Sequence, residues 1–519
     1  MSRELPTKPN LEHLKQQAKD LLHDFQQGDS EAKQHFATHA ASSVAAPKLA
    51  DALHVIARQY GFASWPKLKE HVESLTRVLS PAESLMAAIR AMNADKAAGV
   101  LRDHPELRAQ LNAPIESRSG DATPLLEAVM RSDRQTIDVL LQAGADIHAR
   151  GHHWSGGLSV LDECAPDMAA FLIERGAVLD AHAGARLAML PELQRLVEAN
   201  PGVVSARGAR GQTPLHFAST VEIAEYLLAH GAEIDARDLQ HESTPAQHML
   251  RVLQGRYYRH DRQPVARFLV ARGCRTDILM AAALGDLDLV RRHLDIDPAS
   301  IRTSVSEDYF PKQDPRSGGT IYHLIFGSGR TAHLIARDFG HDDIFRLLME
   351  RTPEDLKLSL TCELGDENAF QALLAKYPNL TRSLSETDRR RLTDAAQNNN
   401  TNAVRLMLAA GWPVDTRGEY HMTPLQWAAW HGNAEMVREI LRYHPQLELK
   451  DNDHDITALG GALHGSVNGW HRDTGDHVAT VEALLQAGAK APKVTDDLEA
   501  SDPVRELLMK YESGTEPRP

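Results

Sequence analysis

The chain has 519 residues, with 57 basic and 71 acidic side chains and a net charge of −14 at pH 7. Hydrophobic residues make up 42% and charged residues 25%, a composition typical of globular proteins and not of disordered ones. The acidic balance weighs against nucleic acid or an anionic membrane surface as the main partner.

Cysteine usage and hydropathy predict a cytoplasmic protein. The three cysteines, Cys164, Cys274 and Cys362, are far apart and form no C-x-x-C pair, which fits a reducing compartment. The first ten residues contain no apolar stretch, so we expect no signal peptide. The longest apolar stretch, residues 278–284, is too short to span a bilayer.

Residues 1–80 are predicted to form a small helical domain. Apolar residues recur at helical spacing between residues 11 and 25, and Gly28 follows as a stop signal. A second stripe runs from Leu49 to Tyr60 and ends at Gly61. Such a domain would shield the apolar end of the repeats that follow, or it would bind a partner separately.

Two sequence elements recur along residues 81–495. The first is a Thr-Pro pair followed by two more residues, at 123–126, 213–216, 244–247 and 423–426. Thr caps a helix, and Pro suits the first helical position because its φ angle is already fixed. The second element is an amphipathic helix that ends on a glycine suited to a left-handed C-cap. These glycines are Gly144, Gly176, Gly231, Gly273, Gly411 and Gly488.

The T-P-L-H and L-L-x-x-G-A elements resemble ankyrin repeats closely, and degenerate copies bring the count to about eleven. The resemblance implies an all-α ankyrin-repeat solenoid, with a small N-terminal helical domain and a capping helix and tail at residues 496–519. In ankyrin repeats the His of T-P-L-H ties its turn to the neighbouring repeat. The stretch at residues 60–73 resembles a segment that precedes ankyrin repeats in bacterial proteins, which suggests a bacterial source.

Four segments depart from the repeat, and departures from a regular scaffold are where function is most expected. Residues 151–163 hold His152, His153 and Trp154 among glycines, either as a contact surface or as a turn whose Trp packs on the next hairpin. Residues 250–268 lengthen the loop between two paired helices, and a solvated insertion is the simpler interpretation. The residues that lengthen it are Arg256, Tyr257, Tyr258, Arg259, His260 and Asp261.

The third departure, residues 302–330, is the longest irregular stretch, and long loops inside compact arrays are usually functional or disordered. Its aromatic content argues against disorder. The residues of interest are Asp308, Tyr309, Asp314, Arg316, Tyr322 and His323.

The fourth departure, residues 454–480, contains an insertion after a first helix that begins near Thr457. Trp427, Trp430 and His431 lie on the first helix of the preceding repeat, and first helices line the concave face of ankyrin folds. Ordinary packing between repeats is the alternative. The inserted residues of interest are Trp470, His471, Arg472, Asp473 and His477.

Motifs for catalysis are weak. The chain has 27 histidines but no H-E-x-x-H, zinc spacing or EF-hand loop, so no metal or cofactor is predicted. No G-x-S-x-G elbow or nucleotide-binding fingerprint is present. Glu242 could face a groove with Asp308 or Asp314 as a carboxylate pair, but their separation is unreadable from the sequence.

The leading hypothesis is a binding scaffold that recognises a protein or peptide on its concave face, with Trp154, Tyr309, Arg316, Trp427, Trp430 and Trp470 as ligand contacts. The alternative is an enzyme or a small-molecule-binding protein whose pocket is formed by residues 151–163, 302–330 and 454–480. Its catalytic candidates are His153, Asp314, Tyr322 and His471.

Overall fold

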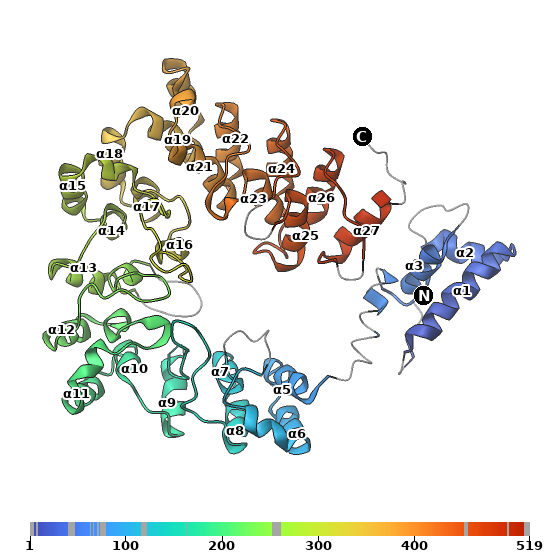
Figure 1. Ribbon diagram of the computed structural model, residues 1–519, viewed down its shortest axis with the longest axis horizontal. Helices are drawn as coiled ribbons and strands as arrows, with labels where there is room; N and C mark the ends of the chain where they lie inside the picture. The colour runs from blue at the N-terminus through green and yellow to red at the C-terminus, as the bar shows by residue number, and fades with distance from the viewer. Residues whose placement is uncertain are drawn as a thin grey trace. The chain divides into compact units, whose positions relative to one another are not determined.

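In a computed structural model of the chain, the regular secondary structure of the described residues is helical (Figure 1). The described residues contain no β-strand, only one isolated antiparallel bridge between Ser304 and Thr331. None of the described helices is both long and apolar enough to cross a membrane. The structure describes residues 5–6, 9–39, 47–62, 64–65, 67–69, 72, 79–115, 122–162, 164–251, 261–450, 455–495 and 498–512.

The contacts divide the chain into two compact units, which we describe one at a time. Unit 1 comprises residues 1–78 and 358–519, and unit 2 comprises residues 79–357.

The N-terminal part of unit 1 holds helices α1 (Leu11–Gln26), α2 (Ser30–His39) and α3 (Leu49–Gln59). The side chain of Asn10 caps α1 by accepting hydrogen bonds from two backbone N–H groups of its first turn. The core of these helices includes Leu14, Phe36 and Ile56, so the predicted apolar stripes face inward. Leu49 departs from that stripe: it is 39% exposed, because it begins α3.

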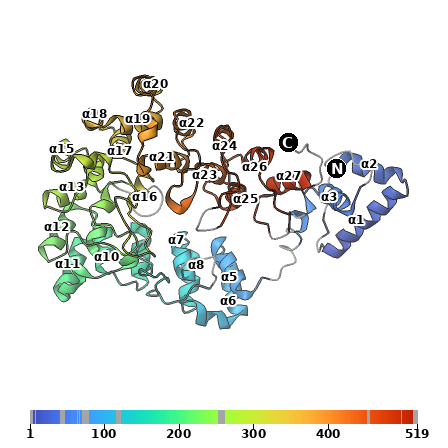
Figure 2. The same ribbon diagram turned by 45° about the horizontal axis from the view of Figure 1, so that its top comes forward.

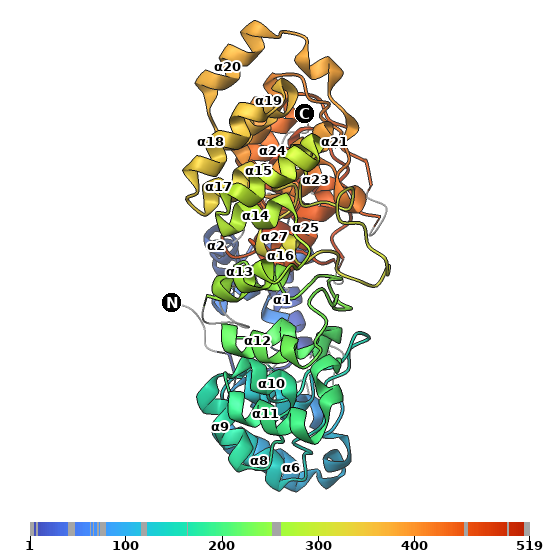
Figure 3. The same cartoon turned by 90° about the vertical axis from the view of Figure 1, so that its left-hand side faces the viewer.

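Unit 2 is built from helix pairs whose members lie beside those of the next pair. Helix α5 contacts α7 while α6 contacts α8, and Figure 3 shows α14, α15, α17 and α18 side by side. Its helices are α5 (Pro81–Arg90), α6 (Ala94–Asp103), α7 (Pro124–Met130), α8 (Arg134–Gln142), α9 (Pro166–Glu174), α10 (Ala181–Arg186), α11 (Leu190–Ala199), α12 (Val221–Ala229), α13 (Gln263–Ala271), α14 (Ile278–Leu284), α15 (Leu287–Ile296), α16 (Tyr322–Ile325), α17 (Ala332–Asp338) and α18 (Asp342–Arg351).

The C-terminal part of unit 1 repeats the same arrangement. First helices α21, α23 and α25 lie in contact in that order, and second helices α22, α24 and α26 do the same (Figure 2). Helix α19 (Glu354–Leu364) contains the boundary between the units. The other helices are α20 (Glu367–Lys376), α21 (Glu386–Gln397), α22 (Thr401–Ala409), α23 (Pro424–Trp430), α24 (Ala434–Leu441), α25 (Ala458–Asn468), α26 (His477–Gln486) and α27 (Asp502–Glu512).

Two of the four predicted helix starts and all six predicted C-cap glycines are confirmed. At Thr244 the prediction of a first helix is wrong, since only a short 3₁₀ turn, η6 (Gln247–Met249), follows it. Thr123 and Thr423 cap α7 and α23 by accepting a hydrogen bond from the third residue of each helix. All six predicted C-cap glycines adopt φ angles between 88° and 100°, a region that residues with a Cβ atom rarely enter.

The repeat that begins at Thr213 differs from the prediction of a full first helix. Residues Pro214–Phe217 form only a short 3₁₀ turn, η5. The cap of the second helix, Thr220, follows three residues after Phe217, so the chain is too short for a seven-residue helix such as α7. The T-P-L-H element therefore keeps its turn here but loses its helix.

Candidate functional site

A pocket with an aromatic lining lies on the first helices of the C-terminal part of unit 1. Helices α21, α23 and α25 each contribute to its wall, and its volume is about 320 Å³. We refer to it as the aromatic pocket. Its lining residues are Gln397, Tyr420, Met422, Trp427, Trp430, Ile456, His464 and Trp470.

Helix α23 positions two of the tryptophans. Thr423 and Pro424 begin the helix, and Trp427 and Trp430 follow at a spacing of three, which puts both rings on one face. Trp427 is only 5% exposed and belongs to the hydrophobic core. Trp430 is half-buried and packs against the same core. The rings are therefore held by the scaffold and not by a loop.

The insertion after α25 supplies Trp470. A Cβ atom on Gly465 would lie 2.3 Å from the carbonyl oxygen of Trp430, so only glycine lets α25 approach α23 this closely. Gly475 makes a similar approach to His431, where a Cβ atom would lie 2.3 Å from the carbonyl oxygen. Between these contacts Trp470 folds back over α23 and remains 68% exposed.

Two aromatic rings of the pocket contact Trp427 at different angles. The Trp470 ring lies 6.0 Å away at an interplanar angle of 23°, and the Tyr420 ring lies 6.3 Å away at 74°. On the other side of the pocket, the rings of Trp430 and His464 are 5.3 Å apart. This arrangement offers π faces in several directions to a single ligand group.

The polar groups near the pocket are neutral or paired. Nε2 of His431 donates to the backbone oxygen of Gln397 at 2.9 Å, and burial lowers the pKa of His431 to about 4. Nδ1 of His464 lies 2.7 Å from a carboxylate oxygen of Glu499. The indole nitrogens of Trp427 and Trp430 are buried and have no hydrogen-bond partner among the described residues.

The candidate His471 lies beside this pocket but does not line it. Its ring centroid is 5.1 Å from that of His431, and its Nδ1 is 3.4 Å from the hydroxyl of Thr474. The structure thus brings together Trp427, Trp430, Trp470 and His471 of the predicted site residues.

A separate group of predicted residues meets in unit 2, where segments 151–163 and 302–330 contact each other. The guanidinium of Arg316 lies 4.5 Å from the ring centroid of Trp154. Two oxygens of Asp314 hold that guanidinium at 3.1 and 2.7 Å, and these bonds lower the pKa of Asp314 to about 2. The carboxylate of Glu242 accepts hydrogen bonds from the backbone N–H groups of Gln313 and Asp314.

These contacts close the segment 302–330 onto the rest of unit 2. The backbone N–H of Gly318 donates to the carbonyl of Gln240 at 2.8 Å, and that of Ile321 donates to the hydroxyl of Ser243 at 3.0 Å. Two smaller pockets lie nearby, of about 230 and 90 Å³. Residues 454–480, the third loop of the alternative hypothesis, belong to unit 1.

The remaining catalytic candidates are engaged in structural contacts. Tyr322 is fully buried, and its hydroxyl donates to the carboxylate of Asp277 at 2.8 Å. Nδ1 of His153 lies 2.7 Å from the hydroxyl of Ser155. Tyr309 is 37% exposed in unit 2. Residues Arg256, Tyr257, Tyr258, Arg259 and His260 lie outside the described part of the chain.

The three cysteines are buried and reduced. Burial raises the pKa of the Cys274 thiol to about 12 and also raises the pKa values of Cys164 and Cys362. Thiols in such surroundings are poor nucleophiles.

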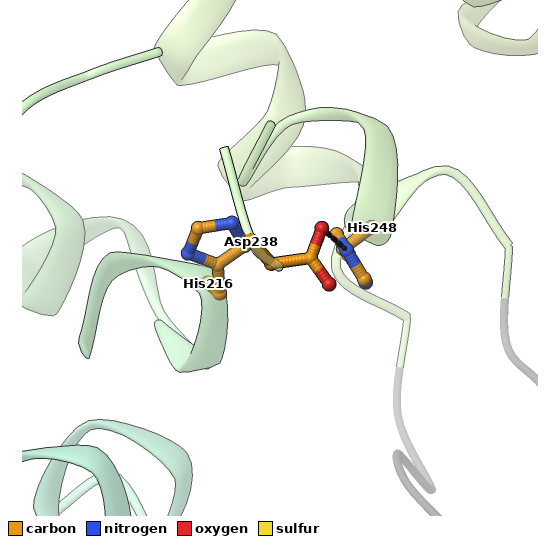
Figure 4. A group of neighbouring side chains, drawn as sticks. All are labelled: His216, Asp238 and His248. Carbon is orange, nitrogen blue, oxygen red and sulfur yellow. Dashed lines mark ion pairs between the residues drawn. The ribbon is translucent and has the colours of Figure 1, made fainter. Parts of the chain in front are cut away.

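One cluster that the sequence did not indicate joins His216, Asp238 and His248 (Figure 4). Nε2 of His248 lies 3.6 Å from a carboxylate oxygen of Asp238. Their ligand-type atoms all lie within 4.8 Å of one another, close enough to consider a metal ion.

The hydrogen bonds of His216 argue against a metal site. Its Nδ1 accepts from the backbone N–H of Thr213 at 3.1 Å, and its Nε2 donates to the carbonyl oxygen of Ser243 at 3.1 Å. Asp238 in turn accepts from the backbone N–H groups of His241 and Ser243. His216 therefore ties its turn to the next repeat, as the resemblance predicts.

Sequence reasoning missed five residues that line the aromatic pocket: Gln397, Tyr420, Met422, Ile456 and His464. The periodicity of the repeat could have predicted one of them, Gln397. Gln397 ends α21, just as Trp430 ends α23, so equivalent positions of adjacent first helices face the same pocket.

Comparison with known proteins agrees with this architecture. Models of ankyrin repeats match residues 358–453, as three copies, and residues 210–239, as one repeat. The chain therefore contains ankyrin repeats, and its fold is an all-α ankyrin-repeat solenoid.

Two proteins of Oryza sativa subsp. japonica are similar over part of the chain. E3 ubiquitin-protein ligase XB3 is 32% identical over 108 residues, 21% of this chain and 24% of that protein. Probable E3 ubiquitin-protein ligase XBOS31 is 31% identical over 146 residues, 28% of this chain and 30% of that protein. The matches thus span less than a third of either relative, and the bacterial source stays a prediction.

Proposed function

We propose that this chain is a binding scaffold that recognises a peptide segment of a protein partner at the aromatic pocket. The supporting observation is the set of three tryptophans and one tyrosine that line a single pocket on adjacent first helices. Large aromatic side chains at the centre of an interface carry much of its binding energy, because they are rigid and bury a large area.

The size and chemistry of the pocket suit one anchoring side chain. A volume of about 320 Å³ holds a large side chain together with part of the adjoining backbone. Trp427 provides a buried floor, while Trp470 is exposed and would lose its remaining exposure on binding. Burial of such a ring contributes about 2 kcal/mol or more at an interface.

A peptide library displayed on phage and selected against the full chain tests the proposal. We expect Trp470→Ala to weaken the selected peptides by about tenfold or more, since an anchor residue contributes at least 1.4 kcal/mol. Trp154→Ala is the matched control, because Trp154 is also a partly exposed tryptophan but lies in unit 2. Equal affinity of the selected peptides for wild type and Trp470→Ala would place the binding surface elsewhere.

A further inference from the structure

The lining of the aromatic pocket excludes several classes of ligand group. It contains no Lys, Arg, Asp or Glu, and its side chains are aromatic or apolar apart from Gln397 and His464. A phosphate or carboxylate would find no cationic partner there. A protonated primary amine would also bind weakly, because its three N–H groups need hydrogen-bond acceptors once water is removed.

The π faces favour a cation that needs no hydrogen bonds. Aromatic rings carry negative potential on their faces, and a cation within about 6 Å of a ring centroid is attracted. The rings of Trp427, Trp470 and Tyr420 present nearly parallel and nearly perpendicular planes around one space. A quaternary ammonium group has methyl groups on its surface, so it can contact several rings at once without leaving a donor unsatisfied.

The net charge of the sequence segment that contains the pocket has the matching sign. Residues 358–519 contain 24 acidic and 16 basic side chains, a net charge of −8. The nearest buried imidazole, His431, is held neutral at pH 7 because burial lowers its pKa to about 4. His464 is paired with the carboxylate of Glu499. A cation approaching the pocket therefore meets a favourable field.

We propose that the aromatic pocket is a cage for a quaternary ammonium group, carried by a trimethylated lysine side chain of the peptide partner. Trp427 and the nearly parallel ring of Trp470 form one side of the cage, and Tyr420 forms a wall nearly perpendicular to Trp427. The inference rests on the proposed function of the same pocket and adds the chemical class that the pocket selects.

The first experiment separates charge from shape. Choline and its uncharged carbon isostere 3,3-dimethylbutan-1-ol are titrated into the full chain and followed by tryptophan fluorescence. We expect choline to bind about tenfold more tightly than the isostere, the effect of about 1.4 kcal/mol of cation–π attraction. Equal affinities, or no binding of either compound, would overturn the proposal.

Single substitutions test which side chain causes the preference for choline over its isostere. Trp470→Leu removes one π face but leaves an apolar side chain at an exposed position. We therefore expect the ratio of the affinities for choline and its isostere to fall toward one. Trp470→Phe keeps a ring and should retain most of the preference. Tyr443→Leu removes a partly exposed aromatic ring that does not line the pocket and should leave the preference unchanged. A preference that survives Trp470→Leu would overturn the assignment of the cage.

A second comparison tests the source of the cation. N-acetyl-trimethyllysine methylamide should bind more tightly than choline, because its aliphatic stem adds apolar contact. Tighter binding of choline would instead indicate that the ligand is a free small molecule. It would overturn the proposal that a peptide carries the ammonium group. If phage-selected peptides depend on Trp470 while choline and its isostere bind equally, the proposed function stands and only this inference fails.

Discussion

The ring of Trp470 lies nearly parallel to that of Trp427, at an interplanar angle of 23° and a centroid distance of 6.0 Å. The two rings differ sharply in burial, since Trp427 is 5% exposed and Trp470 is 68% exposed. One ring therefore belongs to the scaffold and the other to the surface. This difference lets stability and binding be tested separately.

Substitution of the two tryptophans should have unequal effects on stability. We expect Trp427→Ala to lower the free energy of unfolding by about 3–5 kcal/mol, because it removes a large ring from a packed core. Trp470→Ala should change it by less than about 0.5 kcal/mol, as is usual for exposed side chains. Urea unfolding followed by circular dichroism measures both, and a comparable loss for both variants would contradict this division.

His216 should be replaceable by glutamine but not by leucine. In the repeat at Thr423, Gln426 makes equivalent contacts: its oxygen accepts from the backbone N–H of Thr423, and its NH₂ donates to the carbonyl of Ile456. We expect His216→Leu to cost about 1–3 kcal/mol, because the buried backbone N–H of Thr213 loses its acceptor and the carbonyl of Ser243 keeps only the donor from Asp238. His216→Gln should cost clearly less in the same unfolding experiment; equal losses would show that the two hydrogen bonds are not what matters.

Mild acid should destabilise the protein through the buried histidines. Burial lowers the pKa of His216 to about 3 and those of His241 and His431 to about 4, from the ordinary histidine pKa of 6.5. Below pH 6.5 the unfolded chain binds protons that the folded chain does not, so the free energy of unfolding falls as the pH decreases from 7 toward 4. His216→Gln should make this fall shallower. An unchanged slope in thermal melts across this range would contradict the assignment.

Zinc should not stabilise unit 2 through His216, Asp238 and His248. Both ring nitrogens of His216 are used in hydrogen bonds, so a metal would have to break one of them. We expect added zinc or EDTA to leave the melting temperature unchanged within about 1 °C, whereas a ligand at a hundred times its Kd adds about 2.7 kcal/mol. A rise of several degrees that His248→Ala abolishes would establish a metal site instead.

Glu242 should hold the segment 302–330 in place. Its carboxylate accepts hydrogen bonds from the backbone N–H groups of Gln313 and Asp314 at 2.8 and 2.7 Å. We expect Glu242→Ala to speed hydrogen exchange at these two amides by about tenfold, because loss of the acceptors removes local protection. Glu242→Gln keeps one acceptor oxygen and should have a smaller effect. Unchanged exchange in the Ala variant would mean that Arg316 and Trp154 suffice to hold the segment.

Much of the fold could be predicted because its signals are local. The Thr-Pro elements and the glycines after each second helix fix where helices begin and end, and the structure confirms both at Thr123, Thr423 and Gly144. The shortened turn at Thr213 was not predicted, because the Thr-Pro-Leu-His motif at 213–216 is complete. The residues that a full first helix would need are lacking after the motif, where no sequence signal marks their absence.

The candidate site was harder to predict, because it depends on contacts between repeats. Trp427, Trp430 and Trp470 were singled out by residue type, yet their meeting depends on the close approach that Gly465 permits. Tyr322 shows the opposite outcome: an aromatic residue in an irregular segment is a core residue here, because it packs between Phe310 and Phe326 and bonds to Asp277. Residue type alone does not distinguish these two cases.

The most direct test of the central claim is ¹⁹F NMR of the full chain labelled with 5-fluorotryptophan. The chain has six tryptophans, and single Trp→Phe variants assign their signals. On addition of a selected peptide, we predict that the signals of Trp427, Trp430 and Trp470 shift while those of Trp65, Trp154 and Trp412 stay in place. Shifts confined to Trp154, or an absence of shifts at saturation, would contradict binding at the aromatic pocket.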